Sequence, residues 1–317
     1  MNKTLLFNIL AIESESYNCR AMAQFITDHS LACGYEVAED MHGNLYVTKG
    51  KADTYPCIAS HMDTVHAIHG DGIYIIEIGD NVTGMNPRTM EQTGIGGDDK
   101  CGIYAALHCL ASLPACKAAF FVDEETGCEG SAACDLDFFS NCRFILQADR
   151  RGSTDFVDDI NGPLASKDFA KAIKPLLKRH GFKPCAGAMT DVQELRNRNV
   201  GVSVANMSAG YHRPHSPDEY ISLTQLANTC ALMLSICCLP QSFPFIAPPR
   251  LKRNPWQYAK ASKWLAGKPV TEGMQPAPAI PDWTPASILD QWNFDEDGML
   301  IETPEDEKDL AAVWPHV

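Results

Sequence analysis

The chain has 317 residues, of which 45% are hydrophobic and 21% are charged, so it can bury a substantial core in one large or two smaller domains. Its 40 acidic against 26 basic residues give a formal net charge of −14, which disfavours nucleic acid and anionic membranes as partners because both repel an acidic surface. No stretch approaches the roughly 18 to 20 uninterrupted apolar residues of a membrane span, and residues 1–12 lack the layout of a signal peptide, so a cytoplasmic location is expected.

Hydrophobic periodicity and turn residues predict an alternation of helices and strands. In chain order the predicted elements are two helical pieces in 3–33, strands at 35–37, 44–47 and 57–60, a hairpin and loop in 66–97, a helix at about 100–113, strands at 118–122 and 144–148, a helix at about 166–180, a strand at 201–205 and a helix at about 223–238. This alternation predicts a three-layer α/β/α sandwich with a mixed, largely parallel central sheet.

The composition changes at residue 240, where five prolines follow within 16 residues. We therefore predict one domain at 1–239 and a Pro- and Trp-rich C-terminal extension at 240–317 that wraps this domain or contacts partners. The 13 cysteines are odd in number and lie in apolar segments without a repeated C-x-x-C pair, which favours reduced, packed thiols over a disulfide framework.

Five short segments with metal-competent side chains end a predicted strand or begin a helix. They are His61-Met62-Asp63, Asp98-Asp99-Lys100, Asp123-Glu124-Glu125, Asp149, and His212 with His215. Strand ends in an open α/β sheet converge on one edge, so these segments can meet at one site. Each alone has a plainer explanation, such as helix capping by the aspartates, a solvated glutamate loop, or a surface ion pair of Asp149 with Arg150 or Arg151. All five in this order are much less common by chance.

These segments resemble, in the same order, the signatures of co-catalytic di-zinc exopeptidases, among them peptidase T, the tetrahedral aminopeptidases and the aminoacylase and carboxypeptidase relatives. The matching stretches are His61-Met62-Asp63-Thr64-Val65, Gly97-Asp98-Asp99-Lys100-Cys101-Gly102, Asp123-Glu124-Glu125-Thr126-Gly127, Asp149, and His215-Ser216-Pro217-Asp218-Glu219. The match covers about residues 5–238, and residues 1–239 would be the catalytic domain.

The resemblance implies two Zn²⁺ ions, with Co²⁺ or Mn²⁺ as substitutes, bridged by Asp98. His61 and Asp149 would complete one site, and Glu125 and His215 the other. Imidazole and carboxylate groups suit zinc, and a ligating histidine is typically oriented by a carboxylate, here Asp63. Glu124 would be the general base that takes a proton from the bridging water and delivers it to the leaving amine.

Four further residues are candidates for substrate binding. His212 lies three residues before His215, and the H-S-P-D-E context favours His215 as the ligand, which leaves His212 with Tyr211 and Arg213 to line the substrate pocket. Asp191 resembles the family's G-[ST]-D turn, although a helix N-cap explains this position equally well.

The gaps 63–98 and 149–215 leave no room for the lid or dimerisation domain that many relatives insert, so no inserted lid domain is expected. The site would then stay open unless another subunit or the segment 240–317 covers it, with Trp256, Tyr258 and Trp264 as cover or as partner surface.

The expected function is an aminopeptidase or di- and tripeptidase acting on small peptides. The alternative within enzymes is a deacylase or carboxypeptidase acting on N-acyl amino acids. An alternative of another class is a non-catalytic metal-binding scaffold, which is disfavoured because neither Glu124 nor any ligand is missing.

Overall fold

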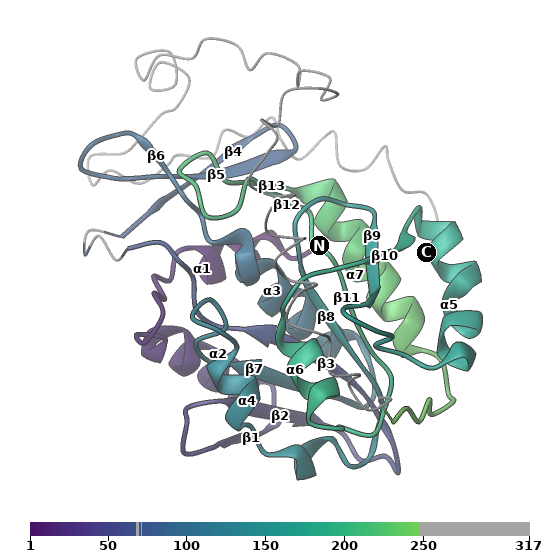
Figure 1. Cartoon of the computed structure of the whole chain (residues 1–317). Helices are drawn as coiled ribbons and strands as arrows, with labels where there is room; N and C mark the ends of the chain where they lie inside the picture. The colour runs from purple at the N-terminus through teal and green to yellow at the C-terminus, as the bar shows by residue number, and fades with distance from the viewer. Residues whose placement is uncertain (68–69, 71, 247–317) are drawn as a thin grey trace, which may run out of the picture. The chain divides into compact units, whose positions relative to one another are not determined.

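The computed structural model describes residues 1–67, 70 and 72–246, which form two β-sheets and the helices that pack on them (Figure 1). In chain order the elements are α1 (Lys3–Leu10), α2 (Arg20–Ala32), β1 (Glu36–Glu39), β2 (Leu45–Lys49), β3 (Tyr55–His61), β4 (Tyr74–Ile78), β5 (Asn81–Met85), β6 (Gln92–Thr93), α3 (Gly97–Ser112), β7 (Cys116–Phe121), α4 (Glu129–Ala133), the 3₁₀ turn η1 (Leu136–Phe139), β8 (Cys142–Arg150), β9 (Asp155–Asp159), α5 (Lys167–His180), β10 (Lys183–Ala186), α6 (Asp191–Asn197), β11 (Val204–Ser208), β12 (Tyr211–His212), β13 (Tyr220–Ser222) and α7 (Leu223–Cys237).

The larger sheet has eight strands in the order β1-β2-β7-β3-β8-β11-β9-β10. The pairs β7-β3, β3-β8 and β8-β11 at its centre are parallel, and so is β9-β10. The pairs β1-β2, β2-β7 and β11-β9 are antiparallel. The prediction of a mixed, largely parallel central sheet is therefore confirmed.

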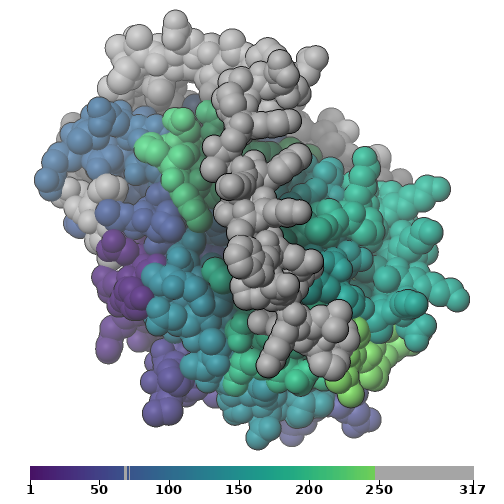
Figure 2. All heavy atoms as spheres, in the orientation of Figure 1, coloured from purple at the N-terminus to yellow at the C-terminus, as the bar shows by residue number. Residues whose placement is uncertain are grey.

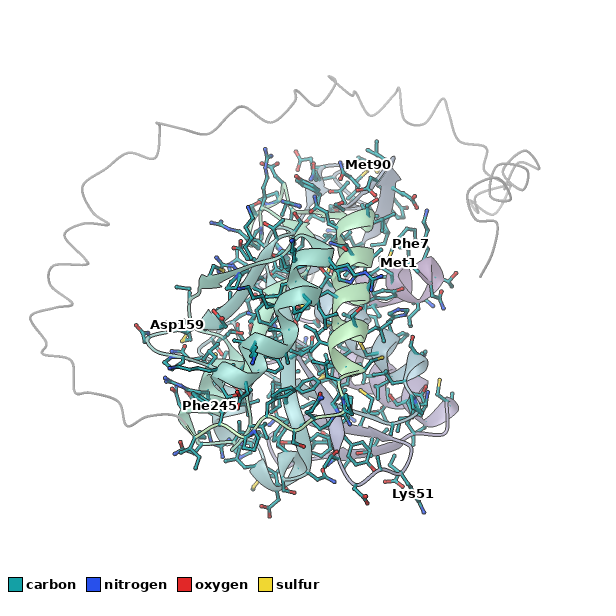
Figure 3. The ribbon with its side chains drawn as sticks, turned by 90° about the vertical axis from the view of Figure 1, so that its right-hand side faces the viewer. Met1, Phe7, Lys51, Met90, Asp159 and Phe245 are labelled. Atoms are coloured by element: carbon teal, nitrogen blue, oxygen red, sulfur yellow. The ribbon has the colours of Figure 1, made fainter. Side chains whose placement is uncertain are left out.

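Helices cover both faces of this sheet, which explains why every residue of the central strand β3 is buried. Alternate side chains of β3 point to opposite faces, so Ile58 joins the core under α1, α2, α3, α5 and α7, whereas Cys57 and Ala59 join a second core with Val192 and Leu195 of α6. Figure 3 shows α5 and α7 side by side on the face of the sheet to which Ile58 points. The predicted three-layer sandwich is confirmed, and residues 1–246, where described, contain no inserted lid domain.

A second, antiparallel sheet has the strand order β12-β13-β5-β4, with β6 also paired to β5. The sequence predicts the hairpin of β4 and β5 but not the pairing of β5 with β13. Tyr220 and Ile221 of β13 pair with Thr83 and Val82 of β5, so the segment just before α7 is fixed to the hairpin. Figure 2 shows the hairpin residues, in blue, at one edge of the described surface.

The strand predicted at 201–205 is displaced, because β11 begins only at Val204. Val202 instead forms a bridge with Pro244, and the Ser203 N–H donates to the Phe243 carbonyl. The Phe243 ring is buried against the rings of Phe144 and Phe169. Residues 243–245 therefore pack on the sheet.

Residues 247–317, the larger part of the predicted extension, lie outside the described residues together with Trp256, Tyr258 and Trp264. The domain boundary at residue 239 stays a prediction. None of the helices in the described part combines the length and the apolar character needed to cross a bilayer. All 13 cysteines are free, and most of them are buried.

Candidate metal centre

The parallel strands β3, β7 and β8 end at the same edge of the central sheet, and each delivers one of the predicted segments there. His61 is the last residue of β3, Asp149 is the last but one of β8, and Glu124 follows β7 by three residues. Because the carboxyl ends of neighbouring parallel strands are adjacent, side chains far apart in the sequence come together.

The His61 imidazole is completely buried, and its two nitrogens have different surroundings. Nδ1 lies 2.9 Å from the Asp63 main-chain oxygen and 3.3 Å from Asp63 Oδ1. Nε2 lies 3.3 Å from Asp98 Oδ1 and 3.7 Å from Asp149 Oδ1, yet it has no hydrogen-bond partner. A ring fixed through one nitrogen, with the other nitrogen unpartnered and facing two carboxylates, is typical of a metal ligand.

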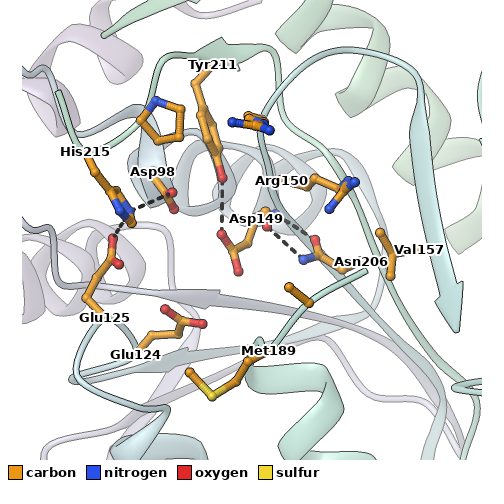
Figure 4. A pocket seen from close by; sticks show the side chains of 13 residues that line it. Asp98, Glu124, Glu125, Asp149, Arg150, Val157, Met189, Asn206, Tyr211 and His215 are labelled. Carbon is orange, nitrogen blue, oxygen red and sulfur yellow. Dashed lines mark hydrogen bonds and ion pairs between the residues drawn. The ribbon is translucent and has the colours of Figure 1, made fainter. Parts of the chain in front are cut away.

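The His215 imidazole approaches the other oxygen of Asp98. Its Nε2 lies 3.3 Å from Asp98 Oδ2 and 3.1 Å from Glu125 Oε1 (Figure 4). Two groups of three residues therefore share Asp98, and within each group the candidate ligand atoms lie within 4.8 Å of one another. They are the two ligand sets that the sequence resemblance implies: His61, Asp98 and Asp149, and Asp98, Glu125 and His215.

Asp98 and Asp99, at the start of α3, make different contacts. Both have non-helical backbone angles, and the peptide bond between them is cis. The buried Asp99 carboxylate accepts the Gly102 N–H at 3.1 Å and the Ser60 hydroxyl at 2.6 Å. The capping explanation thus applies to Asp99, while the Asp98 carboxylate faces the two histidines.

The buried Asp63 carboxylate fixes the loop that carries the two glutamates. Its Oδ1 accepts the N–H of Glu124 at 2.9 Å, and its Oδ2 accepts the N–H of Glu125 at 3.2 Å and the Ser16 hydroxyl at 2.8 Å. Asp123, just before the glutamates, has the left-handed φ of 55° that turns the chain there. One carboxylate therefore positions His61, Glu124 and Glu125 together.

The four crowded carboxylates of the centre have shifted pKa values. Burial, with help from neighbouring carboxylates, raises the pKa of Glu124 to about 9, of Glu125 to about 7 and of Asp149 to about 6. Burial would also raise the pKa of Asp98, but its hydrogen bonds to His215 and His61 outweigh burial and lower it. Such a cluster is stabilised in its ionised form by cations, and two imidazoles with carboxylates are a donor set that fits zinc.

A cavity of about 540 Å³, a volume typical of small-molecule sites, adjoins both groups. Its wall consists of Asp98, Glu124, Glu125, Asp149, Arg150, Arg151, Val157, Ala188, Met189, Asn206, Tyr211, Pro214 and His215. The Tyr211 hydroxyl donates to Asp149 Oδ1 at 3.3 Å, so this predicted substrate residue faces the centre (Figure 4).

The other three residues expected to bind substrate are not among those that line this cavity. The His212 ring pairs through Nε2 with Gln225 at 2.7 Å and stacks on Tyr220, which leaves His215 as the histidine beside the carboxylates. Arg213 lies 3.6 Å from Asp218. Asp191 is completely buried in the first turn of α6, where it accepts from the Gln147 amide at 3.0 Å.

Sequence reasoning missed several residues that line the cavity or hold Asp149 in place. Asn206 accepts the Asp149 N–H at 2.9 Å and donates to the Asp149 carbonyl at 2.8 Å, while Thr190 donates to Asp149 Oδ2 at 2.7 Å. Arg150 forms an ion pair with Asp155 at 2.7 Å, so the surface pair with Asp149 considered for it is not formed. The sequence did contain one indication that Arg150 and Arg151 line the cavity, because both directly follow a candidate ligand at a strand end.

The sequence matches no protein-family model and no curated protein. Several solved structures are similar in fold. The aminopeptidase PepT of Bacillus cereus superposes with a TM-score of 0.62 at 16% identity, over 74% of this chain and 96% of PepT. A tripeptidase of Staphylococcus aureus gives 0.60 at 14% identity, over 75% and 98%. The TET1 peptidase of Pyrococcus horikoshii, which assembles into a tetrahedron or a large octahedral shell, gives 0.53 at 16% identity, over 73% and 98%.

These comparisons confirm the fold that the sequence resemblance implies. The chain has the α/β fold found in these peptidases, with its candidate ligands gathered at one edge of the central sheet.

Proposed function

We propose that this protein is a metal-dependent hydrolase that removes a terminal residue from small peptides, as an aminopeptidase or a di- and tripeptidase. The observation that carries the proposal is the pair of three-residue groups that share Asp98. Zinc is the proposed metal at both groups, with cobalt or manganese as substitutes, because the groups combine imidazole and carboxylate donors. When bound, two such ions would polarise the scissile carbonyl and lower the pKa of water.

The chain's own contribution is proton transfer and positioning. Glu124 is almost completely buried, lines the cavity, and has its Oε2 4.0 Å from His61 Nε2. We assign it as the general base that accepts a proton from the attacking water and returns it to the leaving amine. The Asp63 carboxylate fixes the backbone of Glu124 and of Glu125. Asn206 and Thr190 fix Asp149 through hydrogen bonds.

Peptides are proposed as substrates because the similar structures include an aminopeptidase and a tripeptidase. A substrate panel with the zinc-loaded protein tests this choice. The panel would contain aminoacyl-p-nitroanilides, di- and tripeptides, and N-acetyl amino acids. Cleavage of the first two sets is expected, whereas cleavage of the acetylated set alone would establish a deacylase instead.

Metal content tests the centre itself. We expect about two zinc or cobalt ions per chain after loading, measured by elemental analysis, and a loss of turnover on chelation that either metal restores. Fewer than two ions would count against a co-catalytic centre. Two ions without turnover on any substrate would instead support the non-catalytic metal-binding scaffold.

We also propose that the chain associates with further copies of itself. The basis of this proposal is the half-exposed His215 side chain at the open side of the centre, together with the assemblies of TET1. Sedimentation of the full chain would decide it, because a monomer at all concentrations leaves the centre open on that side.

A further inference from the structure

The wall of the cavity beside the metal centre is divided by charge. Four carboxylates gather at one side, while Arg150 and Arg151 supply the permanent positive charges among the lining residues. In Figure 4, Arg150 and Val157 lie on the opposite side of Asp149 from His215 and Glu125. A ligand that spans the cavity therefore meets the metal ligands at one end and Arg150 at the other, and Arg151, the next residue in the chain, also lines the cavity.

The two arginines are not equivalent. Arg150 Nε donates to Asp155 Oδ2 at 2.7 Å, which compensates its charge. For the Arg151 guanidinium, no ion pair or hydrogen bond is found within the part of the chain that the structure describes. The side chain of Arg151 is therefore available to a ligand in the cavity.

The backbone around Arg151 is fixed, although its side chain is exposed. The Arg151 carbonyl accepts the Ser208 hydroxyl at 3.0 Å, and the Arg150 carbonyl accepts the Ala209 N–H at 2.8 Å. Gly152 donates to the Tyr211 carbonyl at 2.8 Å and accepts from the Gly210 N–H at 2.9 Å. A guanidinium carried on such a pinned segment loses less conformational freedom when it binds an anion.

We infer that Arg151, beside the compensated Arg150, binds a carboxylate of the substrate that lies beyond the cleaved bond. A guanidinium pairs with a carboxylate through two parallel N–H···O bonds, which makes it a specific receptor for this group. The inference rests on the proposed function and narrows it to short peptides that carry a free carboxylate near the scissile amide. That carboxylate is the C-terminus of a dipeptide or an acidic side chain after the cleaved bond, and both present the same chemistry.

Matched substrates separate these two sources. The zinc-loaded full chain would be assayed with Ala-Ala, with Ala-Ala-amide, and with Ala-Glu-amide, which has only a side-chain carboxylate. We expect KM for Ala-Ala to be at least about tenfold lower than for Ala-Ala-amide, with similar kcat, because a charge-assisted pair is lost with the amide. Efficient cleavage of Ala-Glu-amide would assign the site to side-chain carboxylates as well, within the same inference.

Two variants test whether Arg151 causes the difference in KM between Ala-Ala and Ala-Ala-amide. Arg151→Ala should abolish the difference in KM between Ala-Ala and Ala-Ala-amide, whereas Arg151→Lys should keep part of the preference. Arg179→Ala is the matched control, since Arg179 is exposed on α5 and does not line the cavity. Equal KM values for the two substrates in the unmodified protein, or an undiminished preference in Arg151→Ala, would overturn the inference.

A binding measurement keeps this test independent of turnover. Calorimetric titration of zinc-loaded Glu124→Gln protein with Ala-Ala and Ala-Ala-amide should show the same preference of about tenfold, lost when Arg151→Ala is added. If no peptide is cleaved by the unmodified protein, the proposed function fails, and the titration still decides whether Arg151 recognises a carboxylate. Equal binding of both peptides would refute that recognition.

Discussion

The Glu219 carboxylate accepts the Asp98 backbone N–H at 3.1 Å, although 121 residues separate the two in the sequence. Glu219 is completely buried, and its other oxygen lies 2.8 Å from both the Gly96 nitrogen and His66 Nε2. The last of the five segments therefore fixes the turn that presents the shared carboxylate, in addition to supplying His215.

Replacement of Glu219 by alanine should weaken metal binding. The Gly96 and Asp98 N–H groups would lose their buried acceptor, so we expect metal affinity to fall about 10–100-fold and unfolding free energy to fall by about 1–3 kcal/mol. Chelator competition and urea unfolding measure the two effects. Asp218→Ala, at the exposed neighbouring position, should leave both unchanged, and an equal effect there would contradict this role for Glu219.

Asp63→Asn tests how far one carboxylate organises the centre. Asparagine can accept only one of the two glutamate N–H groups and holds His61 less firmly, so a loss of about 10–100-fold in metal affinity is expected. Ser16→Ala removes a single hydrogen bond to the same carboxylate and should cost much less. If both variants bind metal equally well, Asp63 does not have the organising position we assign to it.

Glu124→Gln should separate metal binding from turnover. The amide keeps the size of the side chain but cannot accept the proton, so we expect an unchanged metal content and a fall in kcat of about 10²–10⁴-fold. Steady-state kinetics with elemental analysis of the same sample measure both. Retention of most of the activity would show that another group is the base.

Asp191 should make the stability of the metal-free protein depend on pH. Burial, with nearby carboxylates, raises its pKa to about 7. Because the folded state then holds its proton more tightly than the unfolded state, this group destabilises the fold progressively as pH rises from about 4 to 7, by on the order of 1 kcal/mol per pH unit.

The stability of the Asp191→Asn variant relative to the unmodified protein should therefore increase as pH rises from about 4 to 7 and stay constant above that. Urea unfolding in the presence of a chelator measures the difference at each pH. Asp218→Asn, which removes an exposed carboxylate, serves as the comparison. A difference between Asp191→Asn and the unmodified protein that does not change with pH would disprove the assigned pKa.

The sequence predicted well the features that depend on local pattern. The compact run before His61, the apolar periodicity of α5 and α7, and the order of the candidate ligands all reflect short-range spacing that the sheet brings to one edge. The ligand sets come together as the resemblance implies, while their roles stay predictions.

Features built from distant pairing were not predicted. β12 and β13 have two and three residues and acquire their partner only through β5, and the Asp-rich strand β9 lacks an apolar alternation. The same reason hid Asn206 and Thr190, because only the folded sheet brings them to Asp149. His212 and Arg213 are close to His215 in sequence, but they do not line the cavity. The His212 side chain contacts Gln225 instead, and the Arg213 side chain contacts Asp218.

The pairing of β13 with β5 has a consequence for how the protein matures. A nascent chain synthesised as far as Asp149 contains every residue of one ligand group, whereas the other group needs His215 and the late closure of the small sheet. Contacts of such long sequence separation form slowly. Because Glu219 fixes the turn that presents the shared Asp98, we expect neither group to bind metal in its final geometry before β13 has docked.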